Sequence, residues 1–344
     1  MTLIDRRTLL AAAMAAGPSL AWAKAELGRS WAPRAALPWP VQEIYAAVDG
    51  RGRIVLTGGL VRQGRGLRIE DRTGLYDPAA DAWAEGPRLP SPRHHPMIVA
   101  DVAGRIHAFG GYGAGEGGDW TAMSEVWRLD DDGWTPVSAM PQLLSETVGA
   151  VLGDRIHLVT GRSPKGAANG GWNDQGDVAT HLVFHPADGV WDQARPCPMA
   201  RNSAAGAVLD GALYVAGGRT VEGGGTGRLD RYDPAGDRWD TLAPIPVSAG
   251  GQQVGGGLAM AAVGGRLVAF GGEWFGPRGG SGGGVFAETW IYEPQRDAWR
   301  SGPPMRTPRH GLAGVAAGGV VYALAGGEVV SGGLAGGVVE ALSL

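Results

Sequence analysis

Four charged residues each follow a glycine directly, at one recurring point of the sequence: Arg162, Arg219, Glu273 and Glu328. The glycines end short apolar runs, as in "ALYVAGG" before Arg219 and "RLVAFGG" before Glu273. Two arginines at equivalent points of a repeat could hold a ligand carboxylate, because a guanidinium group offers two parallel hydrogen bonds. Two glutamates nearby could bind hydroxyls or an amine, and either one could act as a general base. The alternative is that exposed loops simply carry charges that pair with one another.

A second set of polar residues lies just before the first apolar run of each unit, in "PRHHP", "ARNSA" and "PRHGL". Aromatic residues that a repeat does not require lie in the same loops, and they suit stacking on a sugar or contact with a peptide. The same rings could instead fold back onto the protein. The predicted ligand-binding residues are Tyr112, Arg162, Trp172, Arg219, Glu273, Trp274, Glu328, His94, Asn202 and His310.

The histidines and the cysteine do not form a metal-binding pattern. His94, His95 and His310 come from units that are not adjacent, whereas a metal site needs three or four convergent ligands. The lone cysteine, Cys197, excludes an intramolecular disulfide. We therefore predict no metal and no cofactor.

The glycines mark an internal repeat. Five Gly-Gly pairs and one single glycine end apolar runs at intervals of 52, 50, 57, 54 and 55 residues. A second run such as "GLYDP" or "LDRYDP" follows in each interior unit, and then a tryptophan. These tryptophans are Trp83, Trp134, Trp191, Trp239 and Trp299. A period of this length predicts a repeat architecture.

This pattern resembles the Kelch repeat, a four-stranded propeller blade with a di-glycine, a Tyr-Asp-Pro-like turn and a spaced tryptophan. The resemblance covers residues 30–344 and implies an all-β, six-bladed Kelch β-propeller. It also implies that both sets of loops face the same mouth of the central channel. The residue types agree, because small side chains fill the first run of each unit, where strands near an axis are crowded.

The segment "SWAPRAALP" at residues 30–38 matches the end of a repeat, "AWAEGPRLP" at residues 82–90. The last unit stops without its tryptophan strand. We therefore expect the N-terminal strand at Trp31 to complete the C-terminal blade and close the ring, which leaves no exposed strand edge. The predicted propeller domain is residues 24–344.

Residues 1–23 are predicted to be a cleaved signal peptide. "DRRTLL" places an arginine pair ahead of a short apolar stretch that ends in Ala21-Trp22-Ala23, as in a bacterial twin-arginine signal. An ordinary secretory signal is the alternative. The expected location is periplasmic or secreted. The formal charge of −4 and the lack of a basic run argue against nucleic acid, and no later stretch predicts a membrane span.

These observations predict an exported, monomeric Kelch-repeat binding protein that recognises a carbohydrate, an acidic small molecule or a peptide at the channel mouth. The alternative is a sugar epimerase or mutarotase resembling the N-acetylneuraminate epimerases, with Glu273 or Glu328 as base and the arginines as a carboxylate clamp. Arg219 departs from that family, which is expected to carry a glutamate there. The copper radical oxidases are a third resemblance, but Cys197 in an outer loop does not suit their Cys-Tyr crosslink.

Overall fold

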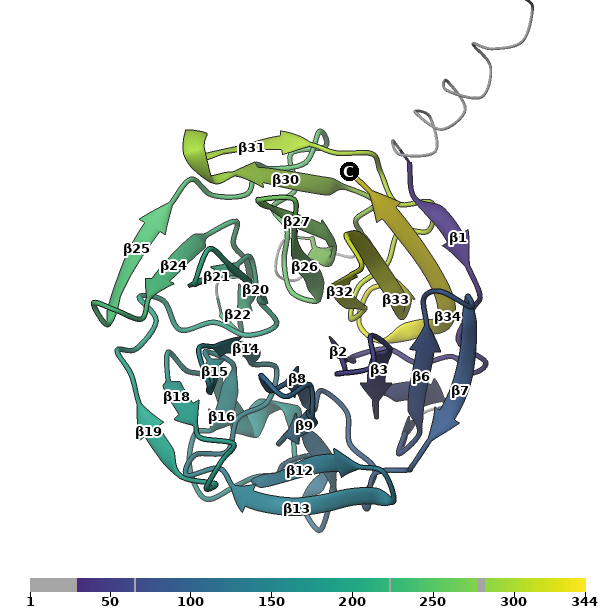
Figure 1. Ribbon diagram of the computed structural model, residues 1–344, viewed down its shortest axis with the longest axis vertical. Helices are drawn as coiled ribbons and strands as arrows, with labels where there is room; N and C mark the ends of the chain where they lie inside the picture. The colour runs from purple at the N-terminus through teal and green to yellow at the C-terminus, as the bar shows by residue number, and fades with distance from the viewer. Residues whose placement is uncertain (1–29, 65, 223, 277–281) are drawn as a thin grey trace, which may run out of the picture.

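The computed structural model describes residues 30–64, 66–222, 224–276 and 282–344. Six four-stranded antiparallel sheets stand around a central axis as the blades of a propeller (Figure 1). The all-β, six-bladed prediction is therefore confirmed. The predicted signal peptide lies outside the described residues.

The blades follow one another along the chain. Blades one to three are β2 (Ala46–Val48), β3 (Ile54–Thr57), β6 (Thr73–Asp77) and β7 (Ala82–Gly86); β8 (Met97–Ala100), β9 (Ile106–Phe109), β12 (Glu125–Asp130) and β13 (Gly133–Ala139); and β14 (Val148–Leu152), β15 (Arg155–Val159), β18 (His181–Phe184) and β19 (Trp191–Gln193). Blades four to six are β20 (Ala205–Leu209), β21 (Ala212–Ala216), β24 (Leu229–Asp233) and β25 (Arg238–Leu242); β26 (Leu258–Val263), β27 (Arg266–Gly271), β30 (Thr289–Glu293) and β31 (Ala298–Ser301); and β32 (Ala313–Ala317), β33 (Val320–Val329), β34 (Gly333–Ser343) and β1 (Ala32–Arg34).

Two-stranded hairpins extend the connection between the second and third strands of each blade. In blades one to five they are β4 (Leu60–Gln63) with β5 (Gly66–Ile69), β10 (Tyr112–Gly115) with β11 (Gly118–Ala122), β16 (Arg162–Pro164) with β17 (Gln175–Asp177), β22 (Arg219–Thr220) with β23 (Gly224–Gly225), and β28 (Glu273–Phe275) with β29 (Gly283–Val285). In blade six, β33 and β34 themselves run on into the hairpin. Short 3₁₀ turns lie at η1 (Trp172–Asp174) and η2 (Pro294–Arg296).

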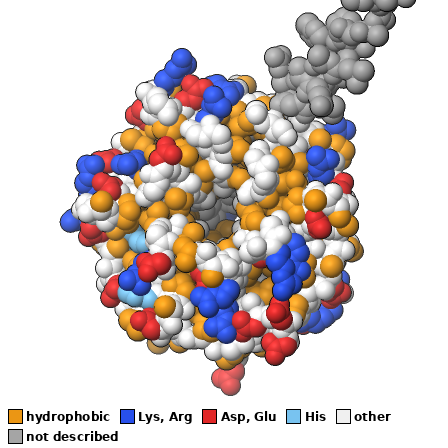
Figure 2. Space-filling view, viewed as in Figure 1, with side chains coloured by type: hydrophobic (Ala, Val, Ile, Leu, Met, Phe, Trp, Pro, Cys, Tyr) orange, Lys and Arg blue, Asp and Glu red, His pale blue; other side chains and the backbone are white. Residues whose placement is uncertain are grey.

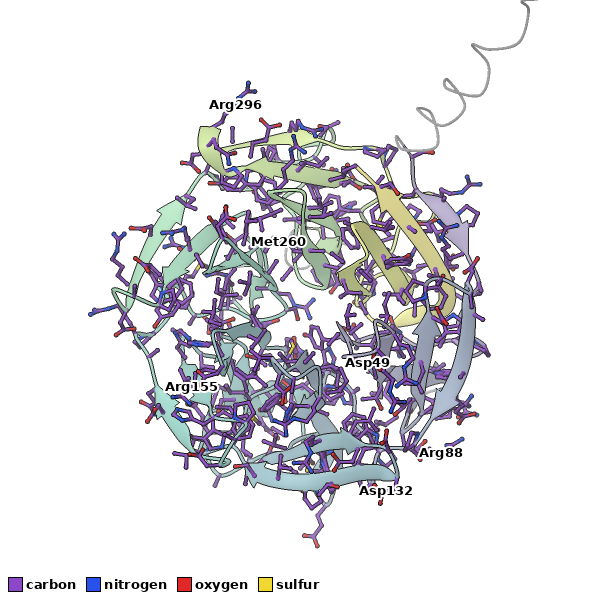
Figure 3. All side chains as sticks on the ribbon, viewed as in Figure 1. Asp49, Arg88, Asp132, Arg155, Met260 and Arg296 are labelled. Carbon is purple, nitrogen blue, oxygen red and sulfur yellow. The ribbon has the colours of Figure 1, made fainter. Side chains whose placement is uncertain are left out.

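The first strand of each blade lies nearest the axis (Figure 1), and small side chains let neighbouring blades approach there. A Cβ atom at Gly206 would lie 2.1 Å from Val148 Cγ1 of the preceding blade, and one at Gly314 would lie 2.5 Å from Ala259 Cβ. Figure 2 shows the hollow that remains along the axis. Charged side chains such as Arg88, Asp132 and Arg296 project from the outer rim (Figure 3).

The ring closes through the N-terminal strand, as predicted. Strand β1 pairs with β34 in antiparallel register, with Ala32 opposite Ala341. Trp31 is buried, and its ring packs edge-on against Phe270 of blade five at 5.0 Å between centroids. Its indole N–H donates to Thr289 Oγ1 (3.0 Å) and the Pro303 carbonyl (3.1 Å). The two chain ends therefore hold blades five and six together.

The other fourth-strand tryptophans fill the gaps between blades in the same way. Four indole N–H groups donate to a backbone carbonyl of the preceding blade: Trp83 to Ala35 (2.8 Å), Trp134 to Pro87 (2.9 Å), Trp239 to Arg195 (2.8 Å) and Trp299 to Ala243 (2.8 Å). Each ring thus combines apolar burial with a satisfied polar edge. Within the described part of the chain, no helix is long and apolar enough to traverse a bilayer.

Candidate functional site

One mouth of the channel is surrounded by a ring of residues in left-handed backbone conformation. The loop that leads into the first strand of every blade contributes one of them, with φ between 50° and 69°: Glu43, His95, Glu146, Ser203, Gly257 and Gly311. Backbone hydrogen bonds of 2.7–3.0 Å connect neighbouring positions at five of the six junctions. The left-handed conformation costs a non-glycine residue about 1–2 kcal/mol. Four non-glycine residues in it therefore suggest a role for their side chains.

The loops that follow each second strand lie beside this ring. Isolated backbone bridges join Gln42 to Leu60, His94 to Tyr112, Ser145 to Arg162, Asn202 to Arg219 and His310 to Gly327. The two loop sets that the sequence singled out therefore meet at one end of the propeller, held by main-chain contacts. This arrangement fixes the side chains at the mouth relative to one another.

The hairpins and the ring enclose a cavity of about 980 Å³. Aromatic side chains from three blades line it: Trp120, Trp172, Trp274 and Phe275. Two of these rings are well exposed, with 38% of Trp172 and 47% of Phe275 accessible. Large apolar surfaces kept accessible in a concave site are typical of ligand binding.

The floor of the cavity is polar and its charges are paired. Arg219 forms an ion pair with Glu273 of the next blade and lies 3.7 Å from Glu146. The Ser331 N–H donates to the second oxygen of Glu273 (3.1 Å). His95 Nε2 lies 2.9 Å from a carboxylate oxygen of Glu43. A Cβ atom at Gly256 would lie 3.1 Å from Arg219 Nε, so a glycine there leaves room for the guanidinium.

The paired charges lower the pKa of two acids, Glu43 and Glu146. Burial alone would raise the pKa of Glu43, but the ion pair and hydrogen bond with His95 hold that pKa well below its usual range. Burial opposes ionisation of Glu146 as well, yet His95, Arg162 and Arg219 lower its pKa below the ordinary value. Carboxylates that accept hydrogen bonds in a desolvated site can bind hydroxyl groups strongly.

Four of the ten predicted ligand-binding residues line the cavity: Trp172, Arg219, Glu273 and Trp274. Arg162 does not line the cavity, because its side chain is fully buried beneath Trp172. Its guanidinium group donates to the carbonyls of Trp172 (2.7 Å) and Gln175 (2.8 Å). The Cζ atom of that group lies 4.3 Å from the centroid of the Trp172 ring. The expected clamp of two arginines on a ligand carboxylate is therefore not formed.

Four other predicted residues do not line the cavity but form hydrogen bonds beneath its floor. Tyr112 donates to Glu146 (3.2 Å), and Asn202 donates to Asp177 (2.5 Å) and accepts from Arg219 Nε (3.1 Å). The remaining two are histidines: Nε2 of His94 lies 2.8 Å from the Asp119 carbonyl, and Nε2 of His310 lies 3.0 Å from the Val329 carbonyl. These residues are buried and orient their neighbours.

The structure places Glu328 outside the cavity lining, which corrects its predicted equivalence to Glu273. In blades four and five the two left-handed residues are the glycines before Arg219 and Glu273, but in blade six they are Ala325 and Gly326. Gly327 therefore occupies the position of Arg219, as its bridge to His310 shows. Glu328 is one residue further on, where an extended strand points its side chain to the other face, and it is exposed.

Sequence reasoning missed the left-handed ring. His95 lies next to the predicted His94 in "PRHHP", and Glu146 lies in the corresponding loop of blade three, "LSETV", but the signal that distinguishes them is a backbone conformation. Glu43 was missed entirely, because "PVQEI" lacks the arginine or polar cluster of the other loops. Among the described residues, no three His, Cys, Asp or Glu side chains are grouped to hold a metal ion.

Comparisons with known proteins agree with the repeat. A family model for the Kelch motif matches residues 200–246. Human Kelch-like protein 34 is 36% identical over 171 residues, which are 50% of this chain and 25% of that protein. Kelch-like protein terF from Aspergillus terreus is 27% identical over 302 residues, 86% of this chain and 62% of that protein. The chain thus spans less than two thirds of either curated relative.

A solved structure of YjhT superposes with a TM-score of 0.71, covering 88% of this chain and 95% of that one. At 15% identity this likeness shows the fold alone. The motif match, the relatives and the six four-stranded blades agree: the chain carries a Kelch motif, folds as a six-bladed β-propeller and is similar to the Kelch-like proteins.

Proposed function

We propose that this protein is a binding propeller whose mouth cavity holds a carbohydrate. The observation that supports this proposal is the combination of four aromatic rings with a floor of ion-paired polar groups in one cavity. The C–H faces of a sugar ring can stack on tryptophan, while its hydroxyls exchange hydrogen bonds with carboxylate and guanidinium groups. A Kelch propeller is suited to such a role, because its loops vary on a rigid scaffold.

The floor favours a sugar over an acidic small molecule. Arg162 is buried, and Arg219 already faces Glu273 and Glu146. A ligand carboxylate would have to displace one of these acids from Arg219. A hydroxyl group can bind beside the existing ion pair without breaking it.

A ligand panel tests the proposal. Neutral sugars, amino sugars, uronic acids, sialic acids and peptides are titrated against the protein, followed by tryptophan fluorescence and by melting temperature, which binding raises. Trp172→Ala and Trp274→Ala are expected to weaken sugar binding while the melting temperature of the free protein changes little. Trp239→Ala is the control, because that ring packs between blades and its loss should lower the melting temperature. Binding of peptides but no sugar would contradict the carbohydrate assignment and favour a protein partner.

A second function, sugar epimerase or mutarotase activity, is favoured by the carboxylate of Glu43 beside His95 at the cavity floor. Such a pair can accept and return a proton. Anomer interconversion of reducing sugars followed by NMR, with and without the protein, tests it. An unchanged rate for every sugar that binds would leave the binding role alone.

We also propose that residues 1–23 direct export to the periplasm or beyond the cell by the twin-arginine route, and that the mature propeller is a monomer. The "DRRTLL" sequence ahead of a short apolar stretch supports the proposed export route. Changing Arg6 and Arg7 to lysine should keep the precursor in the cytoplasm. Normal export of this double variant would point to the general secretory route instead. Light scattering of the purified mature chain measures the oligomeric state.

A further inference from the structure

A chain of three contacts leads from the backbone to the cavity floor. His94 Nε2 lies 2.8 Å from the Asp119 carbonyl oxygen. His94 Nδ1 lies 2.7 Å from His95 Nδ1, and His95 Nε2 lies 2.9 Å from Glu43 Oε2. All three side chains are mostly or fully buried.

The contacts determine where the protons are. A carbonyl oxygen can only accept, so His94 Nε2 carries a hydrogen. Burial and the neighbouring His95 lower the pKa of His94 to about 3, so His94 is neutral and its Nδ1 is an acceptor. His95 must therefore donate from Nδ1. The 2.9 Å contact between His95 Nε2 and the Glu43 carboxyl needs another proton.

That second proton makes the His95–Glu43 pair uncharged overall. If the proton is on His95, an imidazolium cation faces a carboxylate anion. If it is on Glu43, a neutral imidazole faces a neutral carboxyl group. The sum is zero in both cases, so the conclusion does not depend on where the shared proton lies.

The two other carboxylates beside the pair are matched by two guanidinium groups. Glu146 and Glu273 face Arg162 and Arg219, two acids against two permanent cations. Burial and the nearby Glu146 raise the pKa of both Tyr45 and Tyr112, which stay neutral. His310 is a further titratable neighbour, and the cavity lining also contains Arg62 and Glu222. The Nδ1 atom of His310 lies 3.4 Å from Glu273 and 3.7 Å from Glu43, and it forms no hydrogen bond within the described part of the chain.

We propose that His94, by holding a proton on the His95–Glu43 pair, makes this pair at the cavity floor uncharged overall and so selects uncharged sugars over amino sugars and sugar acids. A charged ligand group would lose its hydration without gaining an unpaired countercharge. A hydroxyl group meets both acceptors and donors. His94 is a positioning residue in this account, and the selection rests on the proposed function of the cavity as a carbohydrate site.

The proton assignment is tested on the protein without ligand, by ¹⁵N NMR of its histidines at pH 7. The expected spectrum shows His94 as a neutral ring protonated at Nε2, and His95 with protons attached or strongly hydrogen-bonded at both nitrogens. A His95 ring with one nitrogen free of any proton contact would overturn the inference. This readout does not depend on the ligand.

The selectivity is tested with three sugars that share one ring: glucose, glucosamine and glucuronate. Wild-type protein should bind glucose about tenfold more tightly than either charged sugar. His95→Gln leaves Glu43 unpaired and should shift the ratio of affinities about tenfold toward glucosamine. The double variant Glu43→Gln, His95→Gln removes both charges and should restore the preference for glucose.

The outcomes separate the two proposals. A wild-type protein that binds a charged sugar more tightly than glucose, or a ratio that His95→Gln does not change, overturns the charge selection but leaves a sugar site. Binding of none of the three sugars counts against the carbohydrate proposal, and the ¹⁵N spectrum then decides the proton assignment by itself. If His95→Gln does not fold, the wild-type ratios and that spectrum still decide.

Discussion

The carboxylate of Glu43 occupies the space that a side chain at Gly311 would fill. A Cβ atom at Gly311 would lie 2.8 Å from the Cδ atom of Glu43, although the two residues belong to neighbouring blades. Gly311 is the ring residue of blade six and has a φ of 56°. The absence of a side chain there lets Glu43 reach into blade six, where its carboxylate lies 3.7 Å from His310 Nδ1.

Gly311→Ala should therefore displace Glu43 and weaken sugar binding by about tenfold. It should also cost about 1–2 kcal/mol of stability through its left-handed backbone. Gly318→Ala is a matched control, because its φ is 57° and a Cβ atom there would meet nothing within 4 Å. Calorimetry should show similar losses of stability for both variants and weaker binding for Gly311→Ala alone. Equal binding by the two would mean that the position of Glu43 does not matter.

The fold could be predicted from the sequence because each blade repeats the same local chemistry. A di-glycine, a strand-end turn and a tryptophan recur at a regular period, and Trp31 matches that pattern at the other end of the chain. Its partners, Thr289 and Pro303, come from a blade more than 250 residues away, yet the repeat phase alone predicted which strand it would join.

The site was only partly predictable, for two physical reasons. Side chains such as Arg219 and Glu43 cross from one blade to the next over glycines, and no spacing along the chain reveals such a crossing. Successive side chains of a strand also point to opposite faces. The sequence analysis aligned blade six on Gly326-Gly327, whereas the left-handed pair is Ala325-Gly326. This shift of one residue assigned Glu328 to the cavity, although its side chain lies outside.

Trp31→Ala should destabilise the propeller by about 3–5 kcal/mol, the usual cost of removing a buried aromatic side chain. The variant also loses the indole hydrogen bonds to blade five, and the closure between blades five and six loosens. Denaturant unfolding measures the change. Trp172→Ala is the control, since 38% of that ring is already accessible. A variant at Trp31 as stable as the one at Trp172 would contradict the role of the N-terminal strand in closing the ring.

Arg219→Ala should destabilise the protein in a pH-dependent way. The guanidinium helps to lower the pKa of Glu146 below its ordinary value of 4.5. A depressed pKa contributes stability that is present above the unfolded-state pKa and is lost as the pH falls through the folded-state pKa. The loss of stability in the variant should therefore be full at pH 7, about 3–5 kcal/mol for a broken buried ion pair. It should shrink below about pH 4.5.

Urea unfolding of the wild type and of Arg219→Ala between pH 3 and pH 7 measures this difference. Arg238→Ala provides the comparison, because Arg238 is an exposed arginine whose acid partners are also at the surface. Its effect should be small at every pH. A difference between Arg219→Ala and wild type that stays constant down to pH 3 would rule out the carboxylates of the floor as its cause.

The register of blade six is tested by comparing Glu273→Gln with Glu328→Gln. Glu273 faces Arg219 and accepts from the Ser331 N–H, so the neutral amide should cost about 1–3 kcal/mol through the weaker contact with a charged group. Glu328 is exposed beyond Gly327, so the same change there should leave both melting temperature and sugar binding close to those of the wild type. Melting curves make this comparison even before a ligand is known. Equal losses in the two variants would show that Glu328 shares the environment of Glu273, and the placement of Gly327 at the Arg219 position would then be wrong.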